Sequence, residues 1–87
     1  MKLTSQEYAE MIIKEYYKVP NIANLARAIA RVADKYAKWT MTSLARDNYA
    51  LAEDADLNYA YEQQHEANTK REAYRLALVA LTDKLPK

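Results

Sequence analysis

The sequence predicts an all-α protein: a small helical bundle in which a short N-terminal helix packs on a long antiparallel helical hairpin. Gly is absent and the only prolines are Pro20 and Pro86, so tight turns lack their usual residues. Ala, Leu, Glu, Lys, Arg and Gln, all strong helix formers, are abundant. Apolar residues also recur in steps of three and four. We expect a single domain, residues 1–87, with three helices, or four if the last segment is broken.

The first helix is predicted to begin after Thr4 and to end before Pro20. Thr4 and Glu7 have the spacing of a capping box. Pro20 disfavours helical geometry at the residue before it. One face of this helix is predicted to carry its apolar side chains, namely Tyr8, Met11, Ile12 and Tyr16.

The second helix is predicted to start at a cap, Asn21, and to carry the strongest apolar seam of the chain. We expect a bend between residues 40 and 49, because residues 40–43 are poor helix formers and residues 46–48 are suited to a turn. The seam consists of Ile22, Leu25, Ile29, Val32, Tyr36 and Trp39.

The last segment has a weaker apolar stripe, because Gln64 and Arg71 interrupt it. Thr69 and Glu72 form a second capping-box spacing, so this segment is predicted to be one helix or two with a break near Asn68. The stripe consists of Leu51, Leu57, Ala60, Ala67, Tyr74, Leu78, Leu81 and Leu85.

Charge is sorted along the chain: residues 47–69 carry six acids and no Lys or Arg, whereas residues 21–46 have a net charge of +4. If the chain reverses near residue 46, these two blocks face each other, and an antiparallel dimer would pair them in the same way. Exposed ion pairs contribute about 0 to 1 kcal/mol each, so such pairing would select orientation and partner. Solvated faces are the alternative. The basic row is Arg27, Arg31, Lys35 and Lys38, and the acidic face is Glu53, Asp54, Asp56, Glu62 and Glu66.

Eight tyrosines and no Phe indicate rings at the boundary between core and solvent, because a Tyr hydroxyl needs a partner or water. Tyr is also enriched at protein interfaces. Packing at the edge of the core is the alternative for each ring. The tyrosines outside the clearest seams are candidates for partner binding, and they are Tyr17, Tyr49, Tyr59 and Tyr61.

The sequence contains no complete motif for catalysis or for metal binding. Glu62 and His65 have the Glu-x-x-His spacing of four-helix dinuclear metal sites, but those sites need a second such motif and two further Glu. Ser5 and Ser43 have no flanking Gly and no recognisable triad. We predict no catalytic residue, no metal site and no cofactor, and therefore a protein that is not an enzyme.

Length and composition favour a binding role. With 87 residues, the chain is near the size at which a core alone outweighs chain entropy, so a partner or self-association is expected. The absence of Cys indicates a reducing compartment, and we expect a cytoplasmic protein. The first residues contain no apolar leader and no stretch reaches the about 18 apolar residues of a membrane span, so no membrane association is expected.

The leading hypothesis is a non-enzymatic interaction protein, an adaptor or inhibitor, that docks on a macromolecular partner through its charged helix faces and exposed tyrosines. Its size suits an accessory protein of a bacteriophage or another mobile element. One alternative is a nucleic-acid-binding regulator whose basic row contacts phosphates, although the pI of 7.9 is below the value of about 9 typical of such domains. A structural subunit of a larger assembly and a homodimer are further alternatives.

Overall fold

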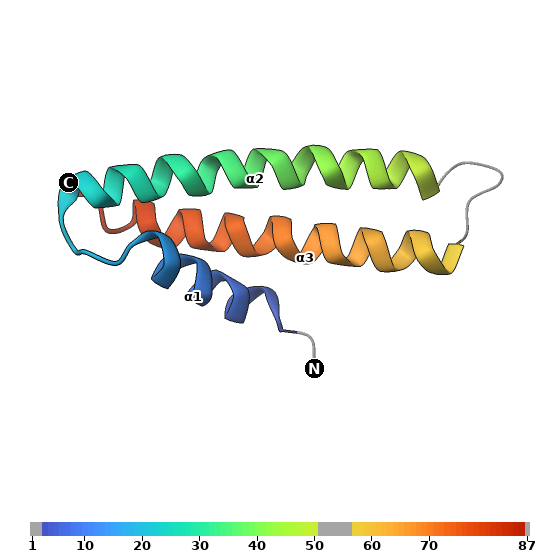
Figure 1. The fold of residues 1–87 in the computed structure, drawn as a ribbon, viewed down its shortest axis with the longest axis horizontal. Helices are drawn as coiled ribbons and strands as arrows, with labels where there is room; N and C mark the ends of the chain where they lie inside the picture. Colours follow the sequence, from blue (N-terminus) through green and yellow to red (C-terminus); the bar gives the residue numbers. More distant parts are fainter. Residues whose placement is uncertain (1–2, 51–56, 87) are drawn as a thin grey trace.

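A computed structural model describes the backbone of residues 3–50 and 57–86 and the side chains of residues 3–46 and 61–86. Within these ranges the chain forms three helices, α1 (Ser5–Tyr16), α2 (Ile22–Ala50) and α3 (Leu57–Thr82). α2 and α3 form a long antiparallel hairpin, and α1 packs beside the C-terminal half of α3 (Figure 1). The predicted all-α bundle, with a short helix on a long hairpin, is confirmed.

The start of α1 is fixed by the predicted capping box. The Thr4 side-chain oxygen accepts a hydrogen bond from the Glu7 backbone N–H at 3.2 Å. In return, the Glu7 carboxylate accepts one from the Thr4 backbone N–H at 3.1 Å. These two contacts satisfy N–H groups that have no partner inside the helix. The hydrogen bond to the Thr4 backbone also lowers the pKa of Glu7 from its usual 4.5.

The buried face of α1 differs from the predicted face at one position. Ala9 and Ile12 are buried, and Ile13 packs against them from the same side. Because Ala9 and Ile13 belong to the contact face, its centre turns away from Met11. Met11 is 55% exposed, so its predicted place in the core was wrong.

The start of α2 is also fixed by its predicted cap, because the Asn21 side chain accepts a hydrogen bond from the Asn24 backbone N–H at 2.9 Å. Leu25 and Val32 are buried as the seam predicted. Ile22 is 59% exposed, which corrects its assignment to the seam. It lies in the first turn of α2, beyond the end of α3, where no helix covers it.

The predicted bend between residues 40 and 49 is wrong, because α2 continues without interruption to Ala50. Two of the suspected breakers bond their side-chain hydroxyls to carbonyls of α2 itself. Thr40 donates to the Tyr36 carbonyl at 2.8 Å, and Thr42 donates to the Lys38 carbonyl at 3.0 Å. Hydroxyl groups that bond back by four residues are compatible with a helix. The chain therefore reverses after Ala50 and not near residue 46.

α3 is a single helix, so the alternative of a break near Asn68 is excluded. The residues that suggested a new helix start have other partners. The Asn68 side chain accepts a hydrogen bond from Ser43 of α2 at 2.8 Å, and the Thr69 carbonyl accepts one from Ser5 of α1 at 3.4 Å. Glu72 forms an ion pair with Arg75 one turn later and does not cap.

Small side chains line the contacts of α3, which contacts both other helices, whereas α1 and α2 touch only slightly. A helix packed on two sides needs apolar residues on two faces, which explains why a single stripe was weak there. Leu85 is exposed because it lies beyond the end of α3, which corrects its place in the stripe. The buried apolar residues are Ala9, Ile12, Leu25, Ala28, Val32, Ala67, Ala73, Ala77 and Leu81.

Enlarging an alanine in this core is expected to destabilise the fold. Ala77 is completely buried, and a Leu at this position must push helices apart, which costs about 1 to 3 kcal/mol. The matched control is Ala45→Leu on the exposed side of α2, which should change the free energy of unfolding by less than about 0.5 kcal/mol. Urea unfolding of Ala77→Leu measures this difference, and equal stability of the two variants would contradict the packing.

Acid is expected to weaken the cap of α1. Because the pKa of Glu7 is lower in the folded state, its contribution to stability is present above pH 4.5 and is lost as the pH falls through the lowered value. Urea midpoints of the wild type and Glu7→Gln, compared between neutral pH and acid, test this. The advantage of the wild type should shrink on acidification, and a constant difference would show that the charge of Glu7 is irrelevant.

Candidate interaction surfaces

The basic row lies on the outward side of α2. Arg27, Arg31 and Lys38 are exposed, and Lys35 is partly exposed. Lys38 forms an ion pair with Asp34 of the same helix at 3.2 Å. In the described part of the chain, the other three cations have no ion pair. The fold therefore presents these charges to solvent on one rigid helix.

Glu62 and Glu66, the described members of the acidic face, do not lie opposite the basic row, which corrects the expected pairing for these two residues. Two contacts fix the register of the hairpin: Ser43 with Asn68, and Arg46 with the carbonyl of Gln63. Extended residue by residue, this register places the basic row beside the last part of α3, whereas Glu66 lies beside Arg46, eight residues past the end of the basic row. The expected pairing failed because the chain reverses after Ala50.

Only part of the acidic face can be placed. Glu62 and Glu66 lie on α3 and are exposed. Glu53, Asp54, Asp56 lie outside the described residues. Their predicted role in partner binding therefore remains a prediction from the sequence.

Arg46 joins the two long helices and was not singled out by the sequence. Its guanidinium donates a hydrogen bond to the Gln63 carbonyl at 2.7 Å and lies 3.7 Å from the Glu66 carboxylate. The same group lies 5.7 Å from the centroid of the Trp39 ring, within the range of a cation–π contact. The sequence did hold a signal for this contact. Arg46 lies two turns after Trp39, so a polar residue continues the inward-facing seam of α2.

Ser43 supplies the second polar contact between α2 and α3. Its side chain is 1% exposed and donates a hydrogen bond to the Asn68 side chain at 2.8 Å. A buried hydroxyl without a partner is costly, so this pair favours one alignment of the two helices. Ser43 therefore has a structural role.

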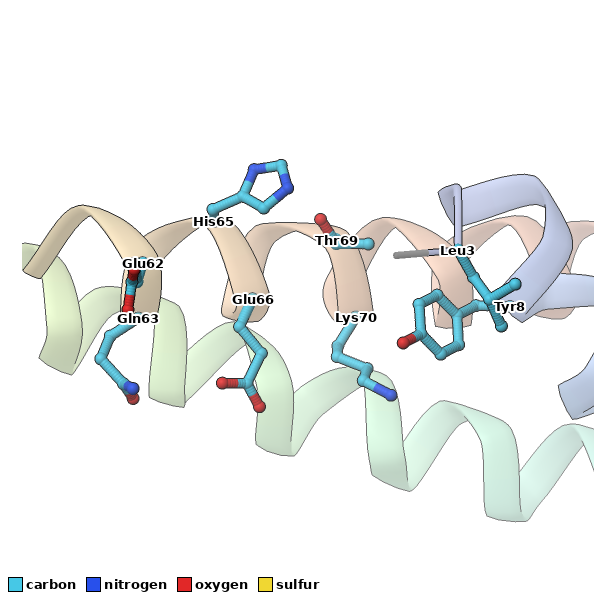
Figure 2. Close-up of a pocket in the computed structure, with 8 residues that line it drawn as sticks. All are labelled: Leu3, Tyr8, Glu62, Gln63, His65, Glu66, Thr69 and Lys70. Atoms are coloured by element: carbon cyan, nitrogen blue, oxygen red, sulfur yellow. The ribbon is translucent and has the colours of Figure 1, made fainter. Parts of the chain in front are cut away.

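A shallow groove of about 360 Å³ follows α3 past the N-terminal end of α1 (Figure 2). The Lys70 ammonium, which also lines this groove, lies 3.9 Å from the centroid of the Tyr8 ring. All buried side-chain N and O atoms of the described residues have hydrogen-bond partners, so no buried unsatisfied group marks the groove as a binding site. The lining residues are Leu3, Tyr8, Glu62, Gln63, His65, Glu66, Thr69 and Lys70.

Among the described residues, Glu62 and His65 do not form part of a larger cluster of metal-binding groups. Figure 2 shows the His65 ring leaving α3 on the side opposite to the Glu66 carboxylate. Among the residues that the structure describes, no three His, Asp or Glu side chains converge in a way that suits a metal ion.

The four candidate tyrosines have different environments. Tyr61 is exposed on α3 and remains available to a partner. Tyr17 is partly buried and packs against the core, and its role in partner binding remains a prediction from the sequence. It follows α1 directly and takes part in the contact face of that helix. The side chains of Tyr49 and Tyr59 lie outside the described residues.

A second row of residues on the outward side of α2 was missed by the sequence reasoning. Its members are all apolar and exposed, and they lie next to the basic row around the helix. Their spacing of three, four or seven residues was the available signal, although the seam on the inward side of α2 gives the stronger pattern. We call this set the apolar row, and it consists of Ala23, Ala26, Ala30, Ala37, Met41 and Leu44.

The bond between Ser43 and Asn68 is expected to make the two residues energetically coupled. Asn68→Ala leaves a buried hydroxyl without its partner and should destabilise the fold by about 1 to 3 kcal/mol. In a Ser43→Ala background the same change should cost less, with a coupling energy of about 0.5 kcal/mol or more. A double-mutant cycle in urea measures this coupling. Strictly additive effects would show that the contact does not stabilise the hairpin.

Comparisons with known proteins give no information on the function of these surfaces. The chain finds no match among protein-family models, curated proteins or solved structures. In the described part of the chain, no helix has the length and apolar character needed to cross a membrane.

Proposed function

We propose that this protein is a non-enzymatic interaction protein that docks on an acidic surface of a protein partner through the basic row of α2. The observation that carries the proposal is that Arg27 and Arg31 are exposed and Lys35 is partly exposed on one side of a helix, without an ion pair in the described part of the chain. An adaptor or an inhibitor would use such a surface. These three cations form no ion pair within the described fold, so they are available to bind a partner.

The basic row carries an energetic cost within the monomer. Arg27 and Arg31, and Arg31 and Lys35, are like charges four residues apart on a helix. Each such pair destabilises a helix by about 0.2 to 0.5 kcal/mol. A partner that supplies carboxylates would remove this repulsion on binding. The register supports the same argument, because Glu66 of the acidic face pairs with Arg46 and not with a residue of the basic row.

The neighbouring apolar row favours a protein partner over a nucleic acid. Met41 and Leu44 are large, exposed and next to the cations around the helix. A phosphate backbone offers nothing apolar to bury against them, whereas a protein surface offers both acids and apolar groups. Arg is also enriched at protein interfaces. Tyr61, exposed on α3, is a further candidate contact.

Reversal of two charges in the basic row is expected to abolish capture of the partner. The experiment retrieves proteins from lysate on tagged wild type and on Arg27→Glu with Arg31→Glu, each with and without nuclease. A specific protein retained by the wild type in both conditions should be lost from the double variant. The reason is that two attractive contacts become repulsive, and such reversal at an interface costs several kcal/mol.

The matched control is Lys18→Glu with Lys84→Glu, which makes the same change of net charge at two exposed positions outside the row. This control should retain the partner. Equal capture by the Arg27 and Arg31 variant would contradict the proposal. Loss of every partner after nuclease treatment would contradict it too, and would assign the basic row to a nucleic acid.

A further inference from the structure

α1 covers only part of the hairpin on which it packs. It has 12 residues, whereas α2 has 29 and α3 has 26. At a rise of 1.5 Å per residue, these helices are about 18, 44 and 39 Å long. The N-terminal end of α1 meets α3 at Thr69, whose carbonyl accepts the hydrogen bond from Ser5. The hairpin therefore continues past the start of α1 as a pair of helices (Figure 1).

The register of the hairpin shows which residues lie beyond this point. Because Ser43 bonds to Asn68, Thr42 of α2 lies level with Thr69 of α3. We call the residues with described side chains beyond this level the arm, and they are 42–46 of α2 and 61–69 of α3. The helical residues on the α1 side of this level form the three-helix part.

Buried apolar side chains are concentrated in the three-helix part, where eight of them form one cluster. The partly buried apolar side chains that pack against this cluster also lie there. The described side chains of the arm include one buried apolar residue, Ala67, which lies outside the cluster. Burial of apolar surface is the dominant favourable term in folding, so the arm is the less stable of the two parts. The members of the cluster are Ala9, Ile12, Leu25, Ala28, Val32, Ala73, Ala77 and Leu81.

Polar contacts hold the two helices of the arm together. Ser43 bonds to the exposed Asn68 side chain. Arg46 donates to the Gln63 carbonyl and pairs with Glu66, and the side chains of this ion pair are 24% and 50% exposed. When the helices separate, water replaces the partners of these groups, so the net stabilisation from each contact is modest.

We infer that the arm opens as one unit while the three-helix part stays folded. Local openings of this kind occur in native proteins and need less free energy than global unfolding. Once the two segments of the arm separate, each is a short helix without a packing partner, and such helices are marginal in water. Loss of either segment also removes the partners of the other. The contacts of the arm should therefore be lost together.

Opening of the arm is a conformational device that leaves the basic row in place. The basic row ends at Lys38, which belongs to the three-helix part. In the open form, the Trp39 ring loses its contact with the Arg46 guanidinium, and the buried Ser43 hydroxyl reaches solvent. The inference depends on the packing of the hairpin and does not rest on the proposed function.

Hydrogen exchange of the full chain tests the inference, measured residue by residue by NMR at increasing urea concentrations. In the regime where the opening equilibrium limits exchange, amides of the arm should exchange at least about tenfold faster than the most protected amides of the three-helix part. Amides of the arm should share one urea dependence, because they open together. This dependence should be intermediate, since it grows with the surface that an opening exposes.

Two results of this experiment would overturn the inference. Equal rates and one urea dependence throughout the chain would mean that the protein opens only by global unfolding. Exchange from the arm that does not depend on urea would mean that its helices fray residue by residue.

Two variants provide an independent test by hydrogen exchange. Ala77→Leu overpacks the cluster in the native and the open forms alike, so it should speed exchange in the three-helix part at least about fivefold and in the arm less than about twofold. Asn68→Ala removes a contact that both openings break, so it should speed exchange in both parts by the same factor. The control is Ala45→Leu, at an exposed position of the arm, which should leave both parts little changed.

Val32→Ala, which leaves a cavity in the same cluster, repeats the test of Ala77→Leu with a truncation in place of an enlargement. It should likewise speed exchange in the three-helix part and spare the arm. If both variants speed exchange in the arm as much as in the three-helix part, the protein unfolds as a single unit and the inference is wrong.

Discussion

The register of the α2 and α3 hairpin is the constraint on which the rest of the structure depends. It is fixed at two polar contacts, Ser43 with Asn68 and Arg46 with Gln63 and Glu66. Apolar helix faces alone permit sliding, whereas a buried hydroxyl and a guanidinium need particular partners. This register determines which charges meet and which remain exposed.

Local features of the fold were predictable because short-range contacts determine them. The capping box at Thr4 and Glu7 and the cap at Asn21 occur where the sequence placed them. The turn was misplaced because propensity does not show whether a hydroxyl is bonded back within a helix, as it is at Thr40. Because the turn was expected too early in the chain, the expected register of the two helices, and with it the expected pairing of the charge blocks, was also wrong.

The candidate surfaces were partly predictable for a related reason. The basic row could be read directly, because residues at i and i+4 of a helix share a side whatever the tertiary fold. The apolar row was missed because alanine is found both in cores and on surfaces, and only the fold shows which side of α2 is covered. On α3 the same ambiguity arose, since Ala73 and Ala77 are buried while the neighbouring Arg75 is exposed.

A distance between spin labels at Arg27→Cys and Glu62→Cys tests the central claim, that the register of the hairpin keeps Glu62 of the acidic face away from the basic row. The observed register places Arg27 beside the end of α3, about 33 Å from Glu62 along the hairpin. Double electron–electron resonance on the dilute protein should give a distance near this value. A distance below about 20 Å would mean that the chain reverses near residue 46 and that the two charge blocks neutralise each other.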